Sequence, residues 1–399
     1  MAFNVRHPVW LPAAPKPGIR VFAGLYTVET FARASIATVL PIQAYDLLAS
    51  EQRVSFAYTF TAFCALAFSL AIPFLIRNLT RRWVYSLGAL ALLGAAFCFT
   101  GFTEPGLVAG MVLRVTGAAC LNVTLSLYIL DHIRKQDYVL NDSVRLGFGT
   151  LGWVVAPYLG VLLYTRYGPG AAYLWSGSWA ALLFAVFWYL RLTDGKAFTR
   201  PQVAPANPLR YVRRFWSQPR LRLAWLIAWG RSSCWSTFFV YAPLLMVTGG
   251  MGKDAGGLLV SLGNAMLVTV LLWGRHAGRF GVRKLSAASF GATGVCLLAA
   301  GYFGAEAPMI SGALLLASML LIIPTDAVGT VPFYRAVHPH ERAEMTAVYR
   351  SYMDLGELLP QLVYGVLLGF WGIGAVFVAL GALLIACALA SWLYLPRRL

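Results

Sequence analysis

Seven ionisable side chains lie inside the long apolar runs of this sequence, where an unpaired charge is costly. They are Glu29, Arg33, Arg114, Arg231, Asp326, Asp354 and Glu357. A charge at the centre of a bilayer costs at least ~2.5 kcal/mol on insertion scales, so residues of this kind are candidates for proton, ion or substrate sites. All seven are therefore candidate functional residues.

Glu29 and Arg33 are four residues apart, which places them on one face of a helix and allows an ion pair. The pair has two interpretations. In the first, the two charges neutralise each other and the pair is structural. In the second, the pair belongs to a wider cluster with Arg231, which an internal repeat places at the position equivalent to Glu29. Such a cluster would hold excess positive charge, which suits an anionic or zwitterionic substrate or a carboxylate that changes partner on proton binding.

A polar stripe runs along one later helix, with Arg350, Asp354, Glu357 and Gln361 at spacings of four, three and four residues. Two buried carboxylates three residues apart repel each other when both are ionised, and binding a proton relieves that repulsion. Asp354 and Glu357 are therefore predicted proton carriers. The alternative is that Arg350 pairs with Asp354 to brace the end of the helix, which leaves only Glu357 unexplained.

Asp326 lies between Pro324 and Gly329, and a helix interrupted by such residues can present an acid together with free carbonyl groups. Its alternative role is an ion pair with Arg231 or Arg33. Glu29 and Asp326 are thus further candidates for proton coupling, and Arg114 adds a cation in the outer half of its run. Glu29, Arg33, Arg114, Arg231 and Asp326 are the predicted substrate-binding charges.

The elements that must position these charges are membrane-spanning helices. The chain has 399 residues, of which 59% are hydrophobic and only 12% charged, too little polar surface for soluble domains. Apolar runs long enough to cross a bilayer predict an all-α polytopic membrane protein with twelve spans. They cover roughly residues 20–48, 53–76, 83–102, 106–130, 145–165, 171–191, 222–248, 254–274, 284–304, 307–333, 346–370 and 373–395.

The distribution of basic residues predicts the orientation. Of the 32 Lys and Arg, 26 fall in connections on one side of these spans, and the other side has only Arg53, Arg166 and Lys253. Basic loops stay in the cytoplasm, so both termini are expected there, in a bacterial inner membrane. The net charge of +17 is then a topology signal that also favours anionic lipid headgroups, and the short loops argue against nucleic acid as a partner.

The two halves of the chain repeat each other at an offset near 200 residues, with Pro41 matching Pro243 and Pro157 matching Pro360. This repeat predicts two pseudo-symmetric six-helix bundles. The predicted divisions are 1–19 for a cytoplasmic segment, 20–191 for the first bundle, 192–221 for a basic linker, 222–395 for the second bundle and 396–399 for the C-terminus.

Three local patterns carry a resemblance to a known family. The loop 274–284 reads GRHAGRFGVRK, Arg114 is followed by Gly117, and the fifth span contains GWVVAPYLG at 152–160. With the twelve spans and the central linker, the chain resembles the major facilitator superfamily along essentially its whole length. The loop looks like the signature G-x-x-x-D-R-x-G-R-R-K of that family, with Gly278 in place of the acid, and the fifth-span pattern resembles G-x-x-x-G-P-x-x-G of proton-coupled antiporters.

The resemblance implies transport by alternating access, with spans one, four, seven and ten around the substrate. It also implies gating and motif roles for Arg81, Arg82, Gly274, Arg279, Gly281, Arg283, Gly152, Pro157 and Gly160. Because both copies of the signature loop lack the acid that gates the cytoplasmic side in that family, another carboxylate would have to replace it. The nearby acids are Asp131, Asp137 and Asp142.

We therefore expect a proton-coupled exporter of a small organic molecule, anionic or zwitterionic, working as a monomer without metal or cofactor. No phosphate-binding loop of the G-x-x-x-x-G-K-[ST] type is present in the sequence, and all five histidines fall outside the spans, which argues against an ATP-driven pump and against an enzyme. Two alternatives stay open: an importer of a small organic anion, and a transporter-like assembly factor or receptor that transports nothing.

Overall fold

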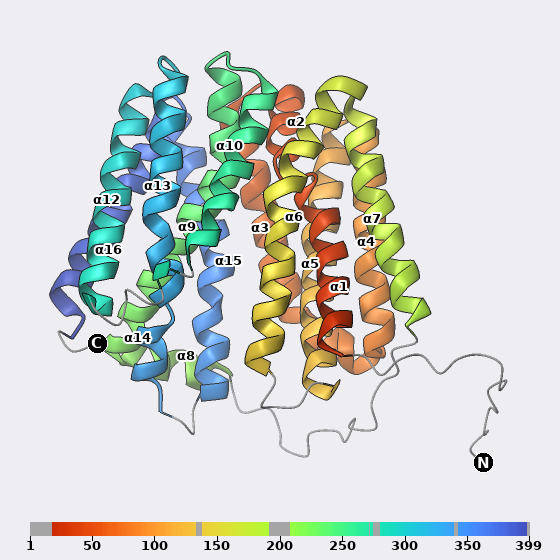
Figure 1. The fold of residues 1–399 in the computed structure, drawn as a ribbon, viewed down its shortest axis with the longest axis horizontal. Coiled ribbons are helices and arrows are strands. Elements are labelled where there is room, and N and C mark those ends of the chain that lie inside the picture. Colours follow the sequence, from red (N-terminus) through yellow and green to blue (C-terminus); the bar gives the residue numbers. More distant parts are fainter. Residues whose placement is uncertain are drawn as a thin grey trace.

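The computed structural model describes residues 18–132, 138–190, 208–270, 272–273, 280–338 and 342–396, and within them all regular structure is helical. The helices run side by side (Figure 1). The first half of the chain forms α1 (Ile19–Ala34), α2 (Val39–Leu48), α3 (Glu51–Asn78), α4 (Arg81–Thr100), α5 (Glu104–His132), α6 (Tyr138–Tyr167) and α7 (Pro169–Tyr189). The second half forms α8 (Pro208–Ser217), α9 (Pro219–Thr248), α10 (Lys253–Ala265), the 3-10 helix η2 (Met266–Thr269), α12 (Val282–Phe303), α13 (Pro308–Val328), α14 (Val331–Ala336), α15 (Arg342–Leu367) and α16 (Gly374–Tyr394).

These helices form the twelve expected spans, arranged as two six-helix bundles. In the first bundle α1 packs on α6 and α7, and α4 packs on α5 and α7. In the second bundle α9 packs on α10, α13, α15 and α16, and α12 packs on α13 and α16. Figure 1 shows the bundles next to each other, with the end that carries α8 at the bottom. We call this end the linker end and the opposite end the distal end.

Two of the described spans break next to a proline, and the eighth span passes from α10 into the 3-10 helix η2. The first span breaks over residues 35–38, between α1 and α2. Pro41 has no N–H to donate to the carbonyl four residues earlier, which favours this break. The tenth span breaks at Gly329 and Thr330, just before Pro332. The interruption thus comes after Asp326, and Pro324 is accommodated inside α13.

The two bundles meet mainly through two helix pairs, α3 with α15 and α6 with α10. The first pair joins the second span of one half to the fifth span of the other, and the second pair joins the fifth span to the second. A two-fold axis between the halves exchanges these pairs, as an internal repeat requires. Residues on α1, α5 and α6 are thereby brought towards residues on α9, α10 and α15.

The linker helix α8 lies across the linker end under α9 and α15 (Figure 1). The side chain of Phe215 is wholly buried in a cluster that includes Trp225 and Tyr349, whereas Arg213 and Arg214 on the same helix are exposed. This division into an apolar and a polar face is typical of a helix that lies at a membrane surface. Residues 191–207 are outside the described ranges.

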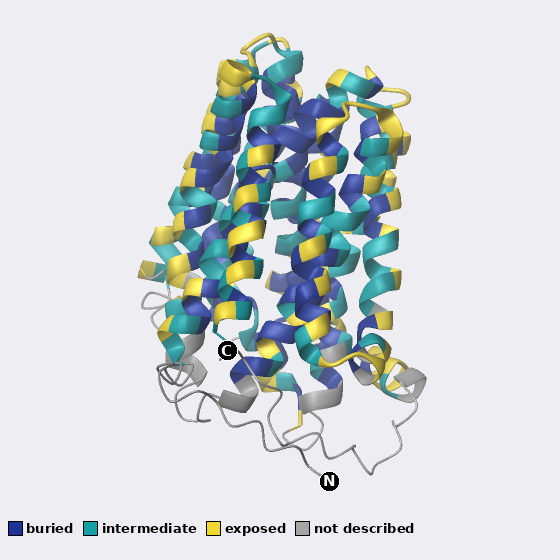
Figure 2. Ribbon diagram, turned by 90° about the vertical axis from the view of Figure 1, so that its right-hand side faces the viewer, coloured by how far each residue is buried: buried dark blue, intermediate teal, exposed yellow. Residues whose placement is uncertain are grey.

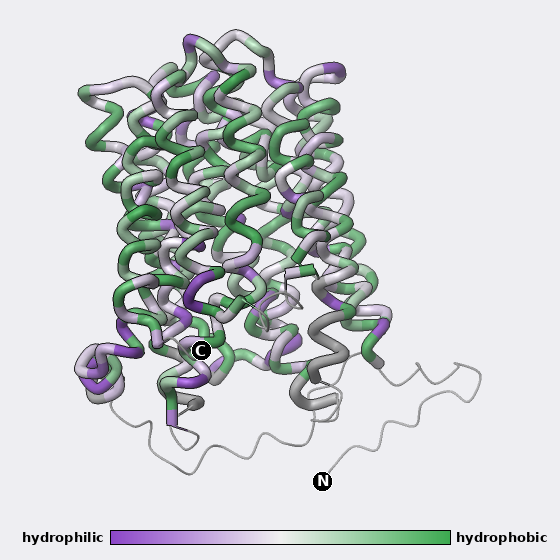
Figure 3. Tube along the Cα trace, turned by 60° about the vertical axis from the view of Figure 1, so that its left-hand side comes forward, coloured by the Kyte–Doolittle hydropathy of each residue, from purple (hydrophilic) through white to green (hydrophobic). Residues whose placement is uncertain are grey.

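Hydrophobic residues predominate along the middle of the helices, and hydrophilic residues are more frequent towards both ends (Figure 3). Exposed residues also occur on the outward sides of the helices along their whole length (Figure 2). Seven of the described helical segments are long and apolar enough to cross a membrane on their own. The helices α1 and α2 are outside this group because they are short, with 16 and 10 residues. The helix α15 is less apolar because it carries Arg350, Asp354 and Glu357.

Candidate functional site

Glu29 and Arg33 form the ion pair that their spacing allows. Oε1 of Glu29 accepts a hydrogen bond from Nη1 of Arg33 at 3.0 Å, within α1. The Glu29 side chain is wholly buried, and its Oε2 atom has no hydrogen-bond partner among the described residues. Arg145 on α6 and Tyr85 on α4 lie within electrostatic range of this carboxylate. The acid is thus enclosed in the first bundle, with one carboxylate oxygen hydrogen-bonded to Arg33 and the other without a hydrogen-bond partner among the described residues.

Arg114 connects α5 to the broken end of α1. Its Nη2 donates to the backbone carbonyl oxygen of Arg33 at 3.4 Å. The last carbonyls of a helix lack partners within the helix, so the break after Ala34 provides the acceptor for this bond. The Nε atoms of Arg33 and Arg114 are buried, and neither has a hydrogen-bond partner in the described part of the chain. The two guanidinium groups are close enough to repel each other, and among the described residues the one acid that forms an ion pair with either of them is Glu29.

Arg231 and Asp326 form the corresponding pair of the second bundle. Nη1 of Arg231 donates to Oδ1 of Asp326 at 2.5 Å, and the indole N–H of Trp235 donates to Oδ2 at 3.2 Å. Nη2 of Arg231 also reaches the hydroxyl of Tyr352 at 3.2 Å. Both oxygens of Asp326 are therefore occupied. Arg231 pairs with this acid and not with Glu29, so the cluster of Glu29, Arg33 and Arg231 considered from the sequence is replaced by one ion pair in each half.

The polar stripe on α15 divides into two parts. Gln361 is buried, whereas Glu357 is exposed although it lies in the middle of the helix, and Asp354 is half-buried. Neither acid forms an ion pair with any described residue. The Arg350 charge acts on Asp354, but no salt bridge of the bracing kind is formed among the described residues.

Glu357 faces the arginines of the other half. Its carboxylate is within electrostatic range of Arg33 and Arg114 in the first bundle and of Asp354 on its own helix. This exposed side chain at mid-helix thus has charges of both bundles within electrostatic range, which places it beside the interface between the bundles. We call Arg33, Arg114, Asp354 and Glu357 the central charge group.

At the distal end, the two halves are joined by charged and polar contacts that the sequence did not reveal. Oδ2 of Asp46, near the end of α2, accepts from Nζ of Lys253 at 2.5 Å and from the hydroxyl of Tyr164 at 2.9 Å. The hydroxyl of Thr165 donates to Oδ1 of Asp254 at 2.8 Å. From the sequence, Lys253 was only an outer-loop charge. No local pattern could show that it meets a residue 207 positions away.

A buried hydrogen-bond network joins the halves on the other side of the interface. The hydroxyl of Tyr241 lies 2.6 Å from Oγ of Ser55 and donates to Oε1 of Gln361 at 2.6 Å. Oγ of Ser55 also donates to the backbone oxygen of Gln361 at 2.7 Å. We call this network and the Asp46 contacts together the distal seal. At the linker end, no polar contact between the two bundles is found among the described residues.

The glycine pattern of the fifth span packs against the first span. A Cβ on Gly152 would lie 2.8 Å from Cγ2 of Thr30, and one on Gly160 would overlap the carbonyl oxygen of Ser35 at the break. Pro157 lies inside α6, and the next residue, Tyr158, donates its backbone N–H to Oγ of Ser261 on α10 at 3.1 Å. The motif thus holds the broken first span closely and contributes one bond between the halves.

The basic motif residues that the structure describes brace each bundle internally. Arg82 at the start of α4 stacks on the ring of Trp188 with its Cζ 3.9 Å from the ring centre, and Arg283 at the start of α12 stacks on Trp392 at 4.8 Å. The two pairs are repeat-related and were not found from the sequence. Arg81 also lies in the first turn of α4. Gly281 precedes α12 with a φ of 77°, a conformation that favours glycine.

Several predicted gating residues lie outside the described part of the chain. They are Gly274 and Arg279 of the signature loop, and the side chains of the substitute acids Asp131, Asp137 and Asp142.

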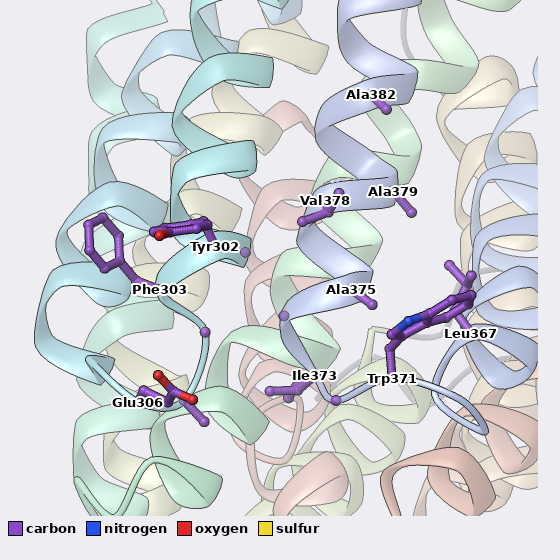
Figure 4. Close-up of a pocket in the computed structure, with 15 residues that line it drawn as sticks. Tyr302, Phe303, Glu306, Leu367, Trp371, Ile373, Ala375, Val378, Ala379 and Ala382 are labelled. Carbon is purple, nitrogen blue, oxygen red and sulfur yellow. The ribbon is translucent and has the colours of Figure 1, made fainter.

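A pocket of about 680 Å³ lies away from these charges, between α12, α15 and α16. Figure 4 shows Tyr302, Glu306 and Trp371 among the side chains that line it. It contains no residue of the central charge group. We therefore do not assign it to the same site.

The Major Facilitator Superfamily profile matches residues 22–266 of the chain. Among solved structures, the nucleoside transporter NupG is similar with a TM-score of 0.74 at 14% identity, covering 93% of this chain and 97% of that chain. A POT family transporter in complex with a thioalcohol-conjugated peptide has a TM-score of 0.73 at 12% identity, covering 93% and 94%. Another POT family transporter, in complex with 5-aminolevulinic acid, has a TM-score of 0.72 at 12% identity, covering 94% of this chain and 95% of that chain. At such identities the likeness concerns the fold. No curated protein matches the sequence.

Proposed function

This chain belongs to the Major Facilitator Superfamily, and we propose that it is a secondary active transporter of a small anionic or zwitterionic organic molecule. The observation that carries this proposal is the central charge group. Arg33 and Arg114 of one bundle lie within electrostatic range of the exposed Glu357 of the other, and no salt bridge joins them among the described residues. Charged side chains kept at mid-membrane without direct pairing are typical of substrate and ion pathways.

In a transporter that works by alternating access, the distal seal is the closed gate of one of the two states. The seal closes one end of the interface between the bundles, and transport requires a second state in which it opens. With the basic residues placed in the cytoplasm, the linker end faces inward and the described state is closed to the outside. A cysteine at Ser217 should then react only with reagents added to the cytoplasmic side, and one at Glu104 only from outside. Reaction of both from the same side would contradict this orientation.

We infer proton coupling from the four candidate carboxylates, whose surroundings differ. Glu357 is exposed beside Asp354, so a proton can reach it and relieves the repulsion between the two acids. Glu29 is enclosed and holds Arg33. Asp326 has both oxygens occupied by hydrogen bonds from Arg231 and Trp235. We assign the proton to Glu357 with Asp354 and expect export by exchange, as the fifth-span motif indicates.

A proteoliposome experiment tests this proposal. With an imposed pH gradient, candidate substrates should drive proton movement across vesicles that contain the protein. Glu357→Gln should abolish proton-driven accumulation and retain exchange of labelled substrate across a membrane without a gradient, when the substrate is supplied at a saturating concentration. Glu306→Gln, which removes an exposed acid at the distal end, is the matched control and should behave as the parent protein. Proton-driven accumulation by Glu357→Gln would contradict the assignment.

One observation favours import of an anion as the second candidate function. If Glu29 binds a proton, its pair with Arg33 is weakened and a positive charge becomes available to an anion. Proton and anion then bind together, and an inward proton gradient drives uptake. Accumulation inside vesicles that are acidic outside, lost in Glu29→Gln, would support import. Accumulation against the opposite gradient supports export.

A further inference from the structure

The central charge group is asymmetric across the interface between the bundles. On the first bundle, Arg33 and Arg114 present two positive charges, of which Glu29 offsets one. On the second bundle, Asp354 and Glu357 present two negative charges, of which Arg350 acts on one. The excess on the α1 and α5 side is therefore positive, and the excess on the α15 side is negative.

These opposite charges do not meet in the described state. Glu357 is exposed, and no ion pair joins it to Arg33 or Arg114 within the described residues. Arg114 is held at its Nη2 atom by the end of α1, which fixes the guanidinium and leaves its Nε atom without a partner. The site thus keeps cations and anions apart on different helices, with the Glu357 side chain exposed.

A ligand with a single charge fits this arrangement poorly. An anion placed at the arginines would lie in the field of Glu357 and Asp354, and a cation placed at Glu357 would lie in the field of two guanidinium groups. In a region of low dielectric such like-charge contacts weaken binding. A ligand that carries both charges satisfies both sides at once.

Resting on the proposed transport function, we propose that the substrate is a zwitterion bound in one polarity, with its anionic group on Arg33 and Arg114 and its amine on Glu357 and Asp354. Such a ligand bridges the bundles, because its two ends bind residues of different halves (Figure 1). It binds most tightly in the state that brings the halves together around it. The substrate therefore favours the closing movement on which transport depends.

A series of ω-amino acids, from glycine to 6-aminohexanoate, tests this inference. It varies the separation of the two charges, and each member has a matched carboxylic acid without the amine and a matched amine without the carboxylate. Binding to the purified full-length protein is measured by the shift in its melting temperature and by calorimetry. We expect at least one amino acid to bind about 10-fold more tightly than its matched acid and its matched amine, since each lost charged hydrogen bond costs that much or more.

Two variants test the polarity. In Glu357→Gln, the amino acid should bind no better than its matched carboxylic acid, and the carboxylic acid should keep its affinity or gain. In Arg114→Gln, the amino acid should bind no better than the matched amine. Glu306→Gln should leave all affinities unchanged, and melting temperatures without ligand show whether each variant is folded.

Three results would overturn the inference: no amino acid of the series binds, the matched acids bind as tightly as the amino acids, or the two variants affect the same group of the ligand. The proposed transport function fails separately. Proton-coupled transport of a simple anion would support the proposed transport function and refute the zwitterionic substrate. Zwitterion binding without any transport would support the zwitterion site and refute the transport function.

Discussion

Replacing Tyr241 by Phe should open the distal seal more than replacing Lys253 by Met. The Tyr241 hydroxyl donates to Oε1 of Gln361 at 2.6 Å and its oxygen lies 2.6 Å from Oγ of Ser55, and all three residues are buried. Without the hydroxyl, these partners lose a hydrogen bond in the sealed state but are hydrated once the seal opens. Leaving buried polar groups unpaired costs about 1–3 kcal/mol. The ratio of distal-open to distal-closed protein should then rise about 5- to 150-fold.

Lys253 and its partner Asp46 have side-chain exposures of 33% and 24%, so water and salt screen their attraction. A pair of this kind contributes about 1 kcal/mol or less to the stability of the sealed state. Lys253→Met should therefore raise the ratio of distal-open to distal-closed protein about fivefold at most. Raising the salt concentration should remove the Lys253 effect and leave that of Tyr241.

Spin labels at Tyr167 and Met309 provide the assay. Both side chains are exposed near the distal end, on different bundles, and their separation should increase when the seal opens. The labels require a background without the six native cysteines. Tyr302→Phe, which removes a hydroxyl from a side chain that is 85% exposed, is the control and should leave the distance distribution unchanged. An equal or larger effect of Lys253→Met, or no effect of Tyr241→Phe, would refute this account of the seal.

Three further predictions concern stability. Gly160→Ala should lower the melting temperature by an amount equivalent to about 1–3 kcal/mol, because its Cβ overlaps the backbone at the break of the first span, whereas Gly147→Ala on the same helix meets nothing and should be neutral. Asp326→Asn should destabilise by about 3 kcal/mol by leaving a buried guanidinium unpaired, and adding Arg231→Met should recover part of the loss; failure to recover would contradict the pairing. Phe215→Ala should cost about 3–5 kcal/mol and detach the linker helix, which proteolysis within that helix would detect; unchanged protease resistance would show that Phe215 does not anchor it.

The sequence predicted the twelve spans and their division into two bundles. Apolar runs of span length can satisfy their backbone groups in lipid only as helices, and a repeat of about 200 residues implies a pair of like bundles. The pair of Glu29 with Arg33 was also predictable, because a separation of four residues brings two side chains together on any helix. For the same reason the polar stripe on α15 was visible before its surroundings were known.

Only the tertiary structure decided how these charges are partnered. Repeat equivalence suggested that Arg231 and Glu29 share a cluster, yet each pairs inside its own bundle, since packing of α9 against α13 brings Asp326 to Arg231. The stripe on α15 likewise divides at Gln361, which belongs to the distal seal, while Glu357 faces the arginines of the other half. Contacts such as that of Asp46 with Lys253 join residues 207 positions apart. They form only when the two bundles dock, so the sequence alone does not show them. Local spacing determines which side chains share a helix face, whereas docking of the bundles determines what that face meets.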